Sequence, residues 1–150
     1  MEPWQIIFFL KDKVDNFYKD GMNFYRSFED PSKVRPLHKG EYHLLNANFE
    51  GPGTKIGLKE VRDFPPYNNV DACAKKHDLA YYEASKLPTQ QERDSAVRKA
   101  DEEFLKDIEK FKNVDGEKIY YEAGKRGIEG KIKIEDLLPI LGRYGAKARK

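Results

Sequence analysis

The apolar positions of this chain recur at helical spacing in several long stretches. From Val70 onward they return every three or four residues, which places their side chains on one face of a helix. The members of that face are Val70, Cys73, Ala74, His77, Ala80, Tyr81 and Ala84. A second face of the same spacing consists of Val97, Asp101, Phe104, Ile108 and Phe111. The pattern predicts two helices, of which the second starts at Thr89 or Gln90 and runs to about Lys112.

Each of these two apolar faces contains one titratable side chain. His77 lies on the first face and Asp101 on the second. A buried imidazole or carboxylate is costly without a partner, so we expect these two side chains to pair with each other. A carboxylate that orients an imidazole creates a candidate general base.

The N-terminal part of the chain has a third apolar stripe. Residues 4–25 fit an amphipathic helix with charged side chains opposite the apolar ones. Trp and Phe suit the headgroup boundary of a bilayer, so the stripe fits a helix that binds a membrane surface. In that interpretation Trp4, Ile7 and Phe8 meet the lipid. The same stripe also fits a helix that packs into the core, and both interpretations stay open.

A Gly-rich loop, F-E-G-P-G-T, occupies residues 49–54 within an irregular stretch from 30 to 66. Gly51 and Gly53 lack a Cβ, so the backbone there can turn its carbonyls inward or approach a ligand closely. Asp78 lies next to His77 and points about 100° away around the helix, where both of its oxygens could face a cation. Loop carbonyls, one bidentate carboxylate and water form the oxygen set that Ca²⁺ accepts.

The remaining segments give weaker patterns. Residues 131–134 alternate as in a strand, residues 119–121 fit a short strand or the start of a helix, and residues 136–144 fit a helix. His38 and His43 lie in the irregular stretch without a partner pattern, so we expect both at the surface.

The composition favours one folded domain with a polar surface. The chain has 150 residues, of which 39% are hydrophobic and 36% charged, and a net charge of only +2, which does not favour nucleic-acid binding. The single cysteine, Cys73, excludes an intramolecular disulfide and leaves too few ligands for a zinc site with His77. No signal peptide or membrane span is visible, so we expect synthesis in the cytosol.

Three motifs in sequence order resemble a known family. They are G-P-G at residues 51–53, D-x-x-A-x-x-H-D-x-x-Y at residues 71–81 and A-D-x-x-F-L at residues 100–105. Together they resemble the calcium-dependent phospholipase A2 superfamily, and most of all the phospholipase domain of parvovirus and densovirus minor capsid proteins. The chain departs from the family at Phe49, where Tyr is usual, and at Ala74, where secreted members have a second cysteine.

This resemblance implies a mainly α, phospholipase A2-like fold with two antiparallel core helices, a calcium-binding loop and no disulfides. It implies a phospholipase A2 that hydrolyses the sn-2 ester of glycerophospholipids, in which His77 activates a water and Asp101 fixes the imidazole tautomer. Tyr81 would support Asp101 through its phenol. The implied ligands of Ca²⁺ are Asp78 and the carbonyls of Phe49, Gly51 and Gly53, with the N–H of Gly51 as a donor to the oxyanion.

The resemblance also implies an organisation and a setting. Residues 1–30 would form an N-terminal amphipathic helix, 31–115 the phospholipase A2-like catalytic core and 116–150 a basic C-terminal extension. The partners would be a phospholipid membrane surface and other capsid proteins, with the protein made in the host cytosol, carried in the virion and active at the endosomal membrane. The alternatives are a cytoplasmic protein, a non-catalytic virion structural or membrane-docking protein of the same fold, and a nucleic-acid-binding module that uses the basic end.

Overall fold

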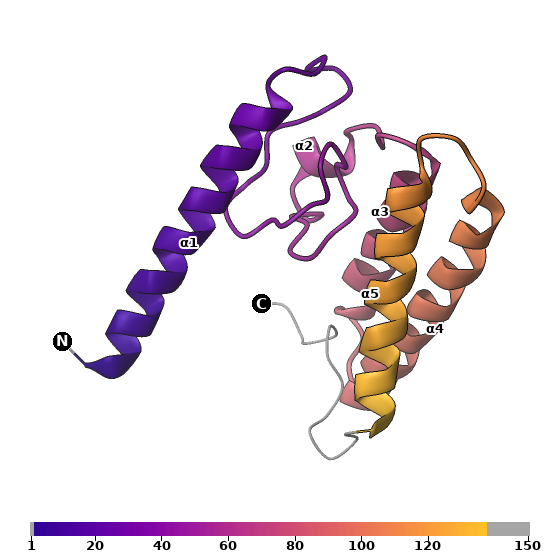
Figure 1. Cartoon of the computed structure of the whole chain (residues 1–150). Helices are drawn as coiled ribbons and strands as arrows, with labels where there is room; N and C mark the ends of the chain where they lie inside the picture. The colour runs from indigo at the N-terminus through magenta and orange to yellow at the C-terminus, as the bar shows by residue number, and fades with distance from the viewer. Residues whose placement is uncertain (1, 138–150) are drawn as a thin grey trace.

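A computed structural model of the chain describes residues 2–137, which are mainly helical (Figure 1). The elements are α1 (Pro3–Arg26), α2 (Lys59–Arg62), α3 (Asn69–Ala84), α4 (Gln90–Ile108), a 3₁₀ turn (Glu109–Phe111) and α5 (Lys118–Leu137). Residues 2–137 contain no strand, and Cys73 is a free cysteine. The mainly α fold without disulfides is therefore confirmed.

Side-chain caps set where the two core helices begin. Asn68 Oδ1 accepts a hydrogen bond of 2.8 Å from the backbone N–H of Asp71, at the start of α3. Thr89 Oγ1 accepts one of 3.1 Å from the backbone N–H of Glu92, at the start of α4. Such caps satisfy N–H groups that have no partner within the helix. Only residues 85–89 join the two helices, so α3 and α4 pack against each other as an antiparallel pair.

The hydrophobic core lies where α3, α4, α5 and the loop before α3 meet (Figure 1). Its largest buried members are Phe49, Ile56, Val61, Val70, Phe104, Ile108, Tyr120 and Tyr121. Each fully buried side chain of this kind is worth about 1.5–3 kcal/mol relative to an exposed one. Apolar packing across three helices thus takes the place of cross-links.

Residues 118–137 differ from the sequence prediction. The strand predicted at residues 131–134 is wrong, because these residues lie inside α5, and residues 119–121 lie in its first turns. The buried positions Tyr120, Tyr121 and Gly124 follow helical spacing, and Ile128 continues the same face against the core. The helical spacing of the buried residues extends over more of the chain than the alternation at residues 131–134, and the whole segment is therefore a helix. The helix predicted at 136–144 and the basic residues 147, 149 and 150 fall mostly or wholly outside the described residues.

Helix α1 extends away from the other helices (Figure 1). Most of its apolar side chains are exposed, with Trp4 at 58% and Ile7 and Phe8 at 66% of their full accessibility, and its buried residues are Asp15 and Arg26. The core-packing interpretation of the stripe is therefore wrong. None of the helices within residues 2–137 is long and apolar enough to cross a bilayer.

Candidate active site

His77 on α3 and Asp101 on α4 face each other inside the helical pair. His77 Nε2 lies 2.7 Å from Asp101 Oδ1, so the contact predicted from the sequence is present. The phenol of Tyr81 donates to the same oxygen, and the rings of Tyr81 and Phe104 pack beside the imidazole at centroid distances of 4.3 and 5.1 Å. Burial raises the pKa of Asp101, but hydrogen bonds from His77, Lys131 and Tyr81 outweigh it and hold that pKa below its ordinary value. Asp101 is therefore an ionised carboxylate that accepts from the imidazole.

A cavity of about 760 Å³ opens beside this pair. His77, Asp78 and Lys131 contribute to its walls, and most of the remaining lining comes from apolar or aromatic side chains and from the Gly-rich loop. Because Nε2 of His77 is bound to Asp101, Nδ1 is the ring nitrogen left for chemistry. The volume lies within the range of cavities that bind small molecules or parts of larger ligands.

The Gly-rich loop brings backbone carbonyls to the same place as Asp78. The hydroxyl of Thr54 lies 3.3 Å from the carbonyl oxygen of Phe49 and 3.4 Å from that of Gly51. The Asp78 carboxyl group also interacts with this Thr54 side chain. Three of the four predicted calcium ligands therefore converge around one hydroxyl group.

Asp78 itself carries an unsatisfied oxygen. Its Oδ2 is buried and has no hydrogen-bond partner within residues 2–137, and burial raises the pKa of this carboxyl group well above its ordinary value. No group of three His, Cys, Asp or Glu side chains in the described part of the chain could hold a metal ion by itself. A cation at this position would thus depend on one carboxylate and on the loop carbonyls, which is a set that suits Ca²⁺.

Gly51 and Gly53 are required by the path of the loop. Their φ angles are 137° and 84°, and a Cβ at either residue would lie 2.0 Å from a backbone carbonyl oxygen. The carbonyl of Pro52, between them, accepts a hydrogen bond of 2.9 Å from the backbone N–H of Tyr42. The N–H of Gly51 and the carbonyl of Gly53 have no partner among residues 2–137, so both stay available for a ligand.

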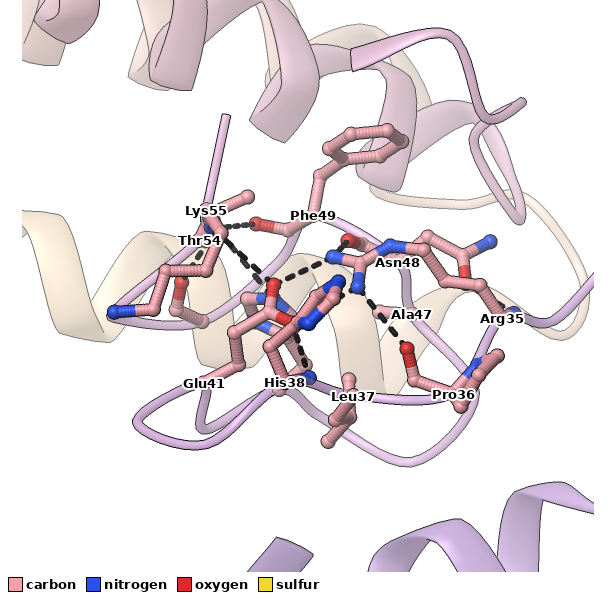
Figure 2. A network of polar contacts seen from close by, with 12 residues as sticks. Arg35, Pro36, Leu37, His38, Glu41, Ala47, Asn48, Phe49, Thr54 and Lys55 are labelled. Atoms are coloured by element: carbon pink, nitrogen blue, oxygen red, sulfur yellow. Dashed lines mark hydrogen bonds and ion pairs between the residues drawn. The ribbon is translucent and has the colours of Figure 1, made fainter. Parts of the chain in front are cut away.

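A buried ion pair holds the irregular stretch before this loop. Figure 2 shows the guanidinium of Arg35 against the carboxylate of Glu41, with N–O distances of 2.9 and 2.6 Å. Arg35 also donates to the carbonyl of Asn48 at 2.7 Å. His43 lies 3.1 Å from Glu41 and is only 1% exposed, so its predicted surface position is wrong. This buried network of hydrogen bonds favours one backbone conformation.

Asp71 on α3 fastens the Gly-rich loop to the helix that carries His77. Its carboxylate accepts backbone hydrogen bonds of 2.8–2.9 Å from Asn48, Phe49, Glu50 and Tyr67. The sequence offers Asn68, Asn69 or Asp71 as the cap of α3. In the structure Asn68 caps the helix, and Asp71 binds the loop. A signal was present, because Asp71 and Asp78 stand seven residues apart and share one helix face.

Arg26 at the end of α1 binds the same stretch from the other side. It donates to the carbonyls of Leu45 and Ala47 at 2.8 and 2.7 Å, and to the side chain of Asn48 at 2.9 Å. Sequence reasoning missed Arg26 and Arg35, because contacts between a side chain and irregular backbone leave no periodic pattern.

Two further residues of the cavity wall were missed. Lys131 on α5 contacts Asp101. One indication of its role is present in the sequence, because Lys131 and Glu135 stand four residues apart, the spacing at which side chains pair on a helix. Glu50, in the loop, is 6% exposed, and both of its carboxylate oxygens lack partners within residues 2–137. By contrast Trp4, Ile7 and Phe8, predicted to meet lipid, do not line the cavity.

Comparison with known proteins gives one match. A family model described as a phospholipase A2-like domain matches residues 40–121, which include the Gly-rich loop, α3, α4 and the start of α5. Curated proteins and solved structures give no match.

Proposed function

The chain belongs to the phospholipase A2-like domain family, and we propose that it is a calcium-dependent phospholipase A2 that hydrolyses the sn-2 ester of glycerophospholipids. One observation carries the proposal. His77, paired with Asp101 behind it, lies in the wall of a largely apolar cavity, beside a loop whose carbonyls converge with Asp78. An apolar cavity suits an acyl chain, and the pair supplies the base that ester hydrolysis needs.

In this mechanism His77 takes a proton from a water molecule at Nδ1 while the water attacks the ester carbonyl. Asp101 accepts from the Nε2–H, which keeps the proton on that nitrogen and leaves Nδ1 free as the base. The same carboxylate stabilises the imidazolium that forms, as the acid does in a serine triad. His77 then returns the proton to the leaving alcohol, and no protein nucleophile is needed.

Tyr81 and Phe104 hold the imidazole in place. Tyr81 donates to Asp101 and packs against His77, and Phe104 also packs beside the imidazole ring. With two aromatic contacts and one hydrogen bond, the ring keeps the orientation in which Nδ1 can reach a bound water. Tyr81 therefore supports the chemistry without taking part in it.

The residues around Asp78 fit a calcium ion. The buried Oδ2 of Asp78 lacks a partner in the described part of the chain, and the carbonyls of Phe49 and Gly51 lie near the same hydroxyl group. The carbonyl of Gly53 is unpaired within residues 2–137 and completes the proposed ligand set. When bound, Ca²⁺ would polarise the ester carbonyl and stabilise the negative charge on its oxygen. The N–H of Gly51 is a second donor for that charge.

The substrate surface in this proposal is a phospholipid membrane. The exposed Trp4, Ile7 and Phe8 on α1 support this, because such side chains enter the headgroup region of a bilayer. The likeness of the three motifs to parvovirus and densovirus capsid proteins supports a virion protein that breaches the endosomal membrane, with other capsid proteins as neighbours. A cytoplasmic protein remains the alternative setting.

The test compares fatty-acid release from phospholipid vesicles by the wild type and by single variants. His77→Gln and Asp101→Asn should each lower turnover by about 10²-fold or more, the contribution typical of general-base catalysis. His38→Gln is the matched control, because His38 lies outside the cavity wall, and it should keep wild-type turnover. Asp78→Asn should raise the calcium concentration for half-maximal activity and weaken calcium binding in calorimetry. Near-wild-type turnover of His77→Gln would refute the proposed base.

A further inference from the structure

Helix α5 brings a lysine to the side of Asp101 that His77 does not occupy. Lys131 Nζ lies 2.7 Å from Asp101 Oδ2, whereas Oδ1 of the same carboxylate binds His77 and Tyr81. Both carboxylate oxygens are therefore held, each from a different direction. Lys131 lies beyond residues 40–121, so the family match does not include it.

Glu135 holds this lysine in turn. Its Oε1 lies 2.7 Å from Lys131 Nζ, one helical turn along α5. Asp101 and Glu135 are buried, and the Lys131 side chain is only 19% exposed. Among residues 2–137, Glu135 forms an ion pair with Lys131 alone. One ammonium group thus bridges two buried carboxylates, an arrangement in which a missing partner leaves a costly unpaired charge.

The rest of the surroundings offers Asp101 no second cation. Arg98, also on α4, pairs with Asp136 at 2.7 Å, and Lys131 is the only lysine or arginine within residues 2–137 that pairs with Asp101. Lys131 also lies over the ring of Tyr81, 5.6 Å from its centroid. If Lys131 is removed, nothing in the described part of the chain keeps Oδ2 in place, and the carboxylate can rotate about its Cβ–Cγ bond.

We propose that Lys131 is a positioning residue for the His77–Asp101 pair and that Glu135 keeps Lys131 in place. By anchoring Oδ2, Lys131 fixes the carboxylate plane so that Oδ1 stays directed at the imidazole. This inference rests on the proposed phospholipase activity. It assigns to α5 a role in turnover that differs from substrate binding, because Lys131 acts through Asp101.

The experiment measures kcat and KM on a dispersed monomeric ester, together with thermal unfolding, for four proteins. These are the wild type, Lys131→Met, the double variant Lys131→Met with Glu135→Gln, and Lys133→Met. Lys133 is the matched control, because it carries the same charge on the same helix and is exposed. The double variant removes the second buried charge, so it keeps the fold if the single variant does not.

Lys131→Met and the double variant should both lower kcat about tenfold to a hundredfold, as is typical of groups that orient a functional side chain through its partner. Although Lys131 also lines the cavity, their KM should change less than about twofold, since the inference assigns its effect to Asp101 and not to substrate binding. Lys133→Met should match the wild type. A kcat of the folded double variant equal to that of Lys133→Met would overturn the inference, and so would a raised KM with unchanged kcat, which indicates substrate binding. If the wild type and Lys133→Met both lack activity, the proposed function fails instead.

Discussion

Glu50 gives a prediction that depends only on the fold, because its carboxyl group is buried in the loop without a partner. Both oxygens are unpaired within residues 2–137, and the carboxylates of Asp71 and Glu117 lie close enough to repel a negative charge. Burial first, and then these two carboxylates, raise the pKa of Glu50 from its ordinary 4.5 to about 8. The folded protein therefore keeps Glu50 protonated at neutral pH.

The sign of the effect on stability follows from proton binding. Between pH 4.5 and 8 the folded state holds a proton on Glu50 that the unfolded chain has lost, so raising the pH favours unfolding. The contribution of Glu50 to stability is complete below pH 4.5, falls as the pH rises, and levels off above pH 8. At about 1.4 kcal/mol for each pH unit, the total loss is about 5 kcal/mol.

The assay is urea unfolding of the wild type and of Glu50→Gln from pH 5 to pH 9, with a chelator that keeps the loop free of metal. Glutamine cannot ionise, so the stability of Glu50→Gln relative to the wild type should rise by about 4 kcal/mol over that range. The unpaired amide of the glutamine costs about 1–3 kcal/mol of stability at every pH. This cost shifts the free energy of unfolding of Glu50→Gln by a constant amount and does not change how that free energy depends on pH. The exposed Glu60→Gln variant is the control. Parallel pH dependence of Glu50→Gln and the wild type would refute the reasoning.

Two other predictions follow from contacts outside the catalytic pair. Asp71→Asn removes a carboxylate that accepts four backbone hydrogen bonds, so it should lower the free energy of unfolding by at least about 2 kcal/mol and weaken calcium binding, as chemical denaturation and calorimetry can measure. Exchanging Trp4, Ile7 and Phe8 together for Ser should reduce hydrolysis of vesicles and spare hydrolysis of a dispersed ester, because these side chains are exposed on α1. A parallel loss of both activities with a lower melting temperature would contradict the interfacial role of α1.

The sequence predicts the helices that carry the site because their periodicity is long and interrupted by single polar residues. His77 and Asp101 each stand out in an apolar stripe, and pairing them is the economical way to bury both. The Gly-rich loop can be recognised in the sequence because its glycines stand close together. The positive φ angles of Gly51 and Gly53 explain why glycine is needed at both positions.

The parts that sequence reasoning did not predict lack such a pattern. The four residues from Lys131 to Ile134 alternate like a strand, but the helix that contains them is set by contacts of Tyr120 and Gly124 with the core. His43 is buried by Glu41 and the loop around it, which no local feature indicates. The bond from Lys131 to Asp101 joins residues 30 positions apart, so it depends on the packing of α5 against α4.

The most direct test of the central claim uses vesicles of phosphatidylcholine that carries a labelled acyl chain at the sn-2 position. The wild-type chain is incubated with them in calcium and, separately, in an excess of chelator. The account predicts labelled free fatty acid and unlabelled lysophospholipid in calcium, with release suppressed in chelator. Equal release in chelator, label retained in the lysophospholipid, or no release in calcium would contradict it.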